Sequence, residues 1–73
     1  MSNKVWKLMY FAGATERMVP HADNPQTRKA ALDNANAVAK NGWRVWVEHQ
    51  RTSERIFESE AERAATALDM EGA

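Results

Sequence analysis

The segment 41–58 carries the pattern that most constrains how this chain can fold. Two sets of residues alternate in it: Trp43, Val45 and Val47 on one side, and Arg44, Trp46 and Glu48 on the other. A period of two is expected of a strand that buries one face. A second short run, Arg55 to Glu58, follows after a polar break. The two runs together predict a β-hairpin.

Length and composition predict one small domain over residues 1–73, with an ordered body over about 4–59 and an acidic tail over 60–73. A chain of 73 residues buries roughly 60% of the surface that its unfolded form exposes, so its core is thin. The chain has no cysteine, which excludes disulfides and thiolate metal sites. The absence of disulfides in so small a domain favours a reducing compartment, and we predict a cytoplasmic location.

Charge is balanced over the whole chain but not along it. Residues 1–51 carry eight basic and four acidic side chains, whereas residues 52–73 carry two basic and six acidic ones. This asymmetry indicates a basic body with an acidic tail. No stretch approaches the ~20 apolar residues of a membrane span. Lys7 interrupts the apolar run near the start of the chain, which argues against a secretory signal.

The rest of the chain predicts two more strands and two helices. Val5–Ala12 has apolar residues at both odd and even positions, so both faces of this strand are largely apolar, as in an interior strand. A turn at 13–15 and a short returning strand over 16–19 are predicted to follow. A helix is predicted within 22–42, with Asn24 as its N-cap, Pro25 in the first helical position and Gly42 in its C-terminal cap. The run 59–62 matches a capping box, which predicts a second helix from Glu60 to about Met70.

These elements predict an α+β fold in ββαββ order. The economical arrangement is a four-stranded, largely antiparallel sheet with the long helix on one face and a short, partly ordered C-terminal helix. The strand order does not follow from the pattern. The size and element order resemble those of small accessory proteins of bacteria and mobile elements, including some phage-encoded inhibitors. That likeness is one of format and assigns no residue.

Residues that could support catalysis or hold a metal are few. His21 and His49 are the two histidines, and Glu48 and His49, adjacent on one strand, would point to opposite faces. The carboxylates at 58, 60 and 62 are explained by a strand end followed by an acidic first helical turn, which the helix dipole favours. We therefore predict a protein that is not an enzyme and that has no cofactor and no metal.

The aromatic residues indicate a binding role instead. If Val45 and Val47 face the long helix, Trp46 lies on the opposite face of the sheet. We expect an exposed tryptophan there, in surroundings typical of a binding hot spot. The predicted partner-binding residues are Trp46, Arg44, Glu48, Tyr10, Lys7 and Arg55. The partner is another protein or a second copy of the chain, and the alternative is that the C-terminal helix or a second copy simply covers Trp46. The hypothesis predicts that Trp46→Ala leaves the fold intact and abolishes binding.

A nucleic-acid-binding protein is the alternative from a different class. Basic residues on the sheet, with Trp46 and Tyr10 to stack on bases, would form the binding face, and the acidic tail would modulate access to it. The overall charge of zero counts against this function, because sequence-independent binding depends on surplus cations.

Overall fold

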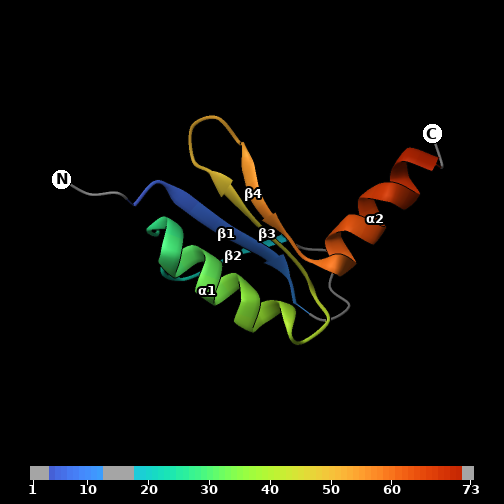
Figure 1. Cartoon of the computed structure of the whole chain (residues 1–73), viewed down its shortest axis with the longest axis horizontal. Coiled ribbons are helices and arrows are strands. Elements are labelled where there is room, and N and C mark those ends of the chain that lie inside the picture. The colour runs from blue at the N-terminus through green and yellow to red at the C-terminus, as the bar shows by residue number, and fades with distance from the viewer. Residues whose placement is uncertain (1–3, 13–17, 72–73) are drawn as a thin grey trace.

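Four strands and two helices make up the computed structural model, which describes residues 4–12 and 18–71 (Figure 1). In chain order they are β1 (Trp6–Phe11), β2 (Met18–Pro20), α1 (Arg28–Ala39), β3 (Arg44–His49), β4 (Arg55–Glu58) and α2 (Glu60–Glu71). The strands form one sheet in the order β2-β1-β3-β4, with every neighbouring pair antiparallel. The predicted four-stranded antiparallel sheet and its β3–β4 hairpin are confirmed. The predicted turn at 13–15 and the start of the returning strand lie outside the described residues.

The main core lies between the sheet and α1, which crosses one face of it (Figure 1). Leu8 pairs with Val47 across β1 and β3, and neither side chain is accessible to solvent. Val45 has the same burial and packs in the same cluster as Ala31 and Ala35 of α1. Alanine at these positions lets the helix approach the strands closely. The valines of β3 therefore face the long helix, as the alternation predicts.

The start of α1 differs from the predicted one. The helix begins at Arg28, and Thr27 is its N-cap, with Oγ1 accepting a hydrogen bond from the Ala30 amide at 3.2 Å. The prediction that Asn24 is the cap and Pro25 the first helical residue is therefore wrong. At the other end, Lys40 is the C-cap of α1, and Gly42 follows two residues later with a φ of +79°, a conformation that glycine adopts at little cost.

Asn24 instead completes the edge of β1. Its side-chain amide accepts a hydrogen bond from the Leu8 amide and donates one to the Leu8 carbonyl, both at 2.9 Å. Two residues later, the backbone of Gln26 exchanges hydrogen bonds with the backbone of Trp6. The Asn24 carboxamide thus takes the place of a peptide group beside β1, beyond the end of the short strand β2. Its residue type predicts that Asn24 caps a helix, but its side chain bonds to the backbone of the sheet.

Ser59 joins β4 to α2, and its hydroxyl group makes three hydrogen bonds. The oxygen accepts from the amides of Val45 and Glu62, and the hydroxyl donates to the Trp43 carbonyl. Half of the predicted capping box is confirmed, because Ser59 does cap α2 through the Glu62 amide. The Glu62 carboxylate contacts two arginines of the sheet instead of the Ser59 amide. Within the described residues, neither helix is long and apolar enough to cross a membrane.

Candidate protein-interaction surface

The face of the sheet opposite α1 carries the candidate site, and we call it the open face. Its side chains come from all four strands: Lys7, Met9 and Phe11 of β1, Arg44, Trp46 and Glu48 of β3, Arg55 and Glu58 of β4, and Met18 and Pro20 of β2 at its edge. Their strands set this arrangement, since Met9 lies opposite Trp46 and Phe11 opposite Arg44. The prediction that Trp46 faces away from the long helix is confirmed.

Trp46 itself is not exposed on this face. It is 4% accessible to solvent, and Met9 opposite it is 7% accessible. The Phe11 ring packs against the indole with centroids 5.9 Å apart, and the Arg55 guanidinium lies 4.6 Å from the indole centroid. The indole Nε1 donates a hydrogen bond to Glu48 at 2.7 Å. The expectation of an exposed tryptophan is therefore wrong, because side chains from neighbouring strands cover it without a second layer of structure.

The guanidinium groups of two arginines lie over aromatic rings on the open face. The Arg44 guanidinium carbon is 4.4 Å from the centroid of Phe11, and Arg55 covers Trp46 in the same way. Both arginines are held by one carboxylate of α2: the Arg44 Nε to Glu62 Oε1 distance is 2.7 Å, and the Arg55 Nη1 to Glu62 Oε2 distance is 3.1 Å. We call the set of Phe11, Arg44, Trp46, Arg55 and Glu62 the arginine–aromatic cluster.

Glu62 is the most buried charge of the cluster. Its side chain is 2% exposed, whereas those of Arg44 and Arg55 are 36% and 35% exposed. A buried carboxylate is tolerated where opposite charges and hydrogen bonds compensate for its lost hydration, and here each oxygen has a guanidinium partner. Burial lowers the pKa of Arg55, but the hydrogen bonds and charges of Glu58 and Glu62 outweigh it and raise the pKa above its usual value. Arg55 therefore stays charged at every physiological pH.

Five of the six predicted partner-binding residues lie on the open face, and Tyr10 does not. Tyr10 pairs with Val45 and packs against the α1 side of the core, where its ring stacks on Trp43 at 6.1 Å. The expectation that Tyr10 shares a face with Trp46 is therefore wrong. Lys7 and Tyr10 are three residues apart on one strand, so a period of two places them on opposite faces.

Two residues of the cluster, Glu62 and Phe11, are not among the predicted partner-binding residues. Phe11 could have been found, because it has the same parity as Lys7 on β1 and must share its face. Glu62 gave no such signal, since the capping-box pattern explains a glutamate at that position without any contact to the sheet. Its role depends on the direction in which α2 leaves β4, and local sequence does not specify that direction.

The histidines have structural roles in the loops. His49 Nδ1 accepts hydrogen bonds from the amides of Arg51 and Thr52 in the β3–β4 turn, and its ring meets the Trp6 ring edge-on at 5.2 Å. His21 Nδ1 accepts a bond from the Asp23 amide. Across residues 4–12 and 18–71, no three histidine, aspartate or glutamate side chains are grouped so that they could hold a metal ion.

Comparison with known proteins adds no family to this description. No protein-family model, curated protein or solved structure matches this chain. The proposals below therefore rest on the geometry of the molecule itself.

Proposed function

We propose that this protein is a non-enzymatic interaction module that binds another protein through its open face. The observation that carries the proposal is the arginine–aromatic cluster, in which one buried carboxylate holds two guanidinium groups over two rings. Arginine and aromatic side chains are the residue types enriched at the energetic centres of protein interfaces. Here Arg44, Arg55 and the half-buried Phe11 form the accessible part of the cluster, above the buried ring of Trp46.

The cluster is already ordered before any partner arrives. Fixing a flexible side chain at an interface costs roughly 0.5–1.5 kcal/mol. Arg44 and Arg55 lose most of this conformational freedom when the chain folds, because Glu62 and the rings fix their positions. Their side chains remain about one-third exposed, and a guanidinium group has five N–H donors, so both arginines can still donate hydrogen bonds to a partner.

An apolar corner of the open face lies beside Arg44, because Phe11 is paired with Met18 on one side and with Arg44 on the other. Met18 of β2 is 49% exposed and lies directly opposite the half-buried Phe11 on β1. Pro20 of the same strand is also exposed and lies opposite Met9. A partner with an apolar contact and nearby hydrogen-bond acceptors would match this combination of exposed thioether and flat guanidinium groups.

The charge of the open face favours a protein over a nucleic acid. Among the described residues of the face and its α2 anchor, three cations are matched by three carboxylates: Lys7, Arg44 and Arg55 against Glu48, Glu58 and Glu62. Nucleic-acid binding draws its affinity from cations that neutralise phosphates. The carboxylates among these arginines oppose that attraction, so the nucleic-acid alternative has less support.

Site-specific photo-crosslinking in cells that express the protein tests the proposal. A photoreactive residue replacing Met18 should give a discrete adduct with a protein that survives nuclease treatment. The matched control replaces Lys29, whose side chain is 86% exposed on α1, and it should give no such adduct. An adduct that nuclease destroys would favour the nucleic-acid alternative. Adducts of equal yield from both positions, or from neither, would overturn the proposal.

A second variant tests the role of the flat guanidinium group. Arg44→Lys keeps the positive charge and a donor for Glu62 but loses the planar surface over Phe11. We expect it to lower the yield of the Met18 adduct at least tenfold while the protein stays folded. A full adduct yield from folded Arg44→Lys protein would show that Arg44 does not contact the partner.

A further inference from the structure

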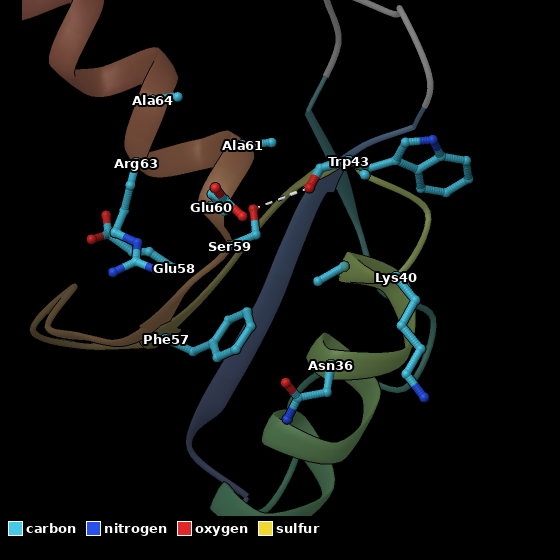
Figure 2. A pocket seen from close by; sticks show the side chains of 12 residues that line it. Asn36, Lys40, Trp43, Phe57, Glu58, Ser59, Glu60, Ala61, Arg63 and Ala64 are labelled. Carbon is cyan, nitrogen blue, oxygen red and sulfur yellow. Dashed lines mark hydrogen bonds between the residues drawn. The ribbon is translucent and has the colours of Figure 1, made fainter.

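A groove separates α2 from the end of α1, on a different part of the surface from the open face. Its volume is about 750 Å³. Phe57 of β4 lies between the two helices, with Asn36 on the α1 side and Ala61 and Ala64 on the α2 side (Figure 2). Trp43 and Ala39 add further apolar surface to its lining. The groove is therefore largely apolar and is bounded on one side by a helix.

That helix is fixed at its beginning and projects from the body at its end (Figure 1). Ser59 and Glu62 attach the first turn to the sheet. Further along, Thr66 bonds to carbonyls within α2 itself, and Leu68 is 68% exposed. An isolated helix of 12 residues is marginal in water, and most helices in proteins depend on a packed apolar face. The outer half of α2 has an apolar face and lacks that packing.

The apolar face of α2 complements itself. Ala61, Ala64, Ala65 and Leu68 recur at helical spacing and form one stripe. A two-fold axis midway between Ala64 and Ala65 would set Ala64 against Ala65 of a second, antiparallel copy. The same axis sets Leu68 against Ala61 of that copy, because Leu68 and Ala61 are equally far from the midpoint. The largest side chain of the stripe thus meets a small one beside the groove.

The position of the groove fits this arrangement. Ala61 and Ala64 form its α2 wall, so Leu68 of the second copy would enter beside Phe57. The last turn of α2 has no basic residue, and it would approach the groove that Lys40 borders. The same axis brings that turn to the acidic first turn of α2, so we expect added salt to strengthen the dimer by screening the like charges.

We propose that the groove accepts Leu68 of a second copy of this chain, forming a symmetric dimer through antiparallel α2 helices. Each contact is made twice, as a two-fold interface requires. A standard interface takes about 800 Å² from each partner, about one-sixth of the 5174 Å² accessible surface of the chain. The stripe residues Ala61, Ala64, Ala65 and Leu68 lie outside the arginine–aromatic cluster, so the dimer can be tested separately from binding at the open face.

Mass measurement in solution tests the proposal directly. Sedimentation equilibrium over a range of concentrations should show a species of twice the 8.3 kDa chain mass. Leu68→Glu changes an exposed side chain, so the monomer should stay folded while the dimer dissociation constant rises at least 100-fold. Two matched controls should leave the dimer unchanged: Ala67→Glu on the same helix outside the stripe, and Met18→Glu at the other exposed large apolar residue.

Cysteine crosslinking tests the register of the two helices. The chain contains no cysteine, so Ala61→Cys combined with Leu68→Cys introduces the two thiols alone. Within one helix they are about 10 Å apart along the axis, too far for an internal disulfide. Oxidation should therefore give a covalent dimer, whereas Ala67→Cys alone should give at most one-tenth of that yield.

Several outcomes would overturn the proposal. One is a wild-type chain that stays monomeric up to about 1 mM, which would assign the groove to a different occupant. Another is a dimer that persists in folded Leu68→Glu protein or that fails to crosslink between positions 61 and 68. Circular dichroism of each variant separates loss of the dimer from loss of the fold.

Discussion

At Trp46, long polar side chains act as the covering layer of a sheet that has a helix on its other face. The Arg55 guanidinium lies 4.6 Å from the indole centroid, and Met9 and Phe11 close the sides. Arginine can bury its aliphatic stem against apolar atoms while its charged group stays hydrated. A thin domain thus gains a second small apolar cluster without adding a second helix to that face.

The burial of Trp46 reverses the expected effect of its removal. Trp46→Ala should lower the free energy of unfolding by about 3–5 kcal/mol, the range for deleting a large buried aromatic side chain. Trp46→Phe should cost about 1 kcal/mol, since it loses the Nε1 hydrogen bond to Glu48 but keeps a ring under Arg55. Urea denaturation would measure both. A midpoint for Trp46→Ala equal to that of the parent would contradict the burial.

Glu62 should matter far more than its neighbour on the same helical turn. Glu62→Gln removes the charge that faces Arg44 and Arg55 and should lower the free energy of unfolding by about 2 kcal/mol, because hydrogen bonds to charged groups are worth about 1.5–3 kcal/mol. Glu60→Gln is the matched control at an exposed position and should change stability by less than about 0.5 kcal/mol. Equal effects in thermal melts would mean that the buried ion pairs contribute nothing specific.

Among the elements, the edge of β1 shows how a side chain can extend a sheet. Because Asn24 bonds to both backbone groups of Leu8, Asn24→Ala should lower the free energy of unfolding by about 1–3 kcal/mol. Asn24→Ser discriminates between the two roles considered for this residue. Serine is as good a helix cap as asparagine but has no amide group to bond both the N–H and the C=O of Leu8.

Asn24→Ser should therefore be about as unstable as Asn24→Ala. A serine variant as stable as the parent in chemical denaturation would return Asn24 to the role of a cap. Thr27→Ala provides the comparison, since it removes the observed cap of α1 and should cost about 1 kcal/mol.

The strands and helices were predictable where their own periodicity determines which face is buried. Alternation in β3 correctly placed Val45 and Val47 toward α1 and Trp46 away from it. The signals that failed depend on contacts distant in sequence. Asn24 bonds to Leu8, 16 residues away, and Glu62 bonds to Arg44, 18 residues away. Residue type alone favoured the local role in both cases.

The exposure of Trp46 was the error with the greatest effect on the candidate site. A side chain that faces away from a helix does not have to face water. The two differ here because Arg55 approaches Trp46 from the next strand, and because α2 supplies the carboxylate that fixes Arg55 in place. Neither the strand order nor the direction of α2 follows from the pattern of residues 43–48.

On the scale of the whole molecule, α2 makes the chain elongated. The body and helix together measure 43 × 24 × 18 Å, and α2 extends away from the sheet (Figure 1). In a dilute monomer, amide hydrogens beyond the anchored first turn of α2 should exchange rapidly, because few tertiary contacts oppose local opening. Core strands β1 and β3 should remain protected.

Concentration should change this exchange pattern if the second copy packs on α2. Hydrogen exchange followed by mass spectrometry should show amides near Leu68 slowed at least tenfold between dilute and concentrated samples, with β1 and β3 unchanged. In the Leu68→Glu variant, the same amides should exchange at the same rate in dilute and concentrated samples. Slowing of α2 in that variant as well would show that crowding or a different contact is responsible.

Glu62 also gives the molecule a mechanical property. This carboxylate belongs to the first turn of α2, yet it is the shared anchor of Arg44 and Arg55 on the open face. We expect a change in the tilt of α2 about Ser59 to move both guanidinium groups, because the same carboxylate bonds to both. Contact at the far end of the helix would then alter the positions of Arg44 and Arg55 on the open face.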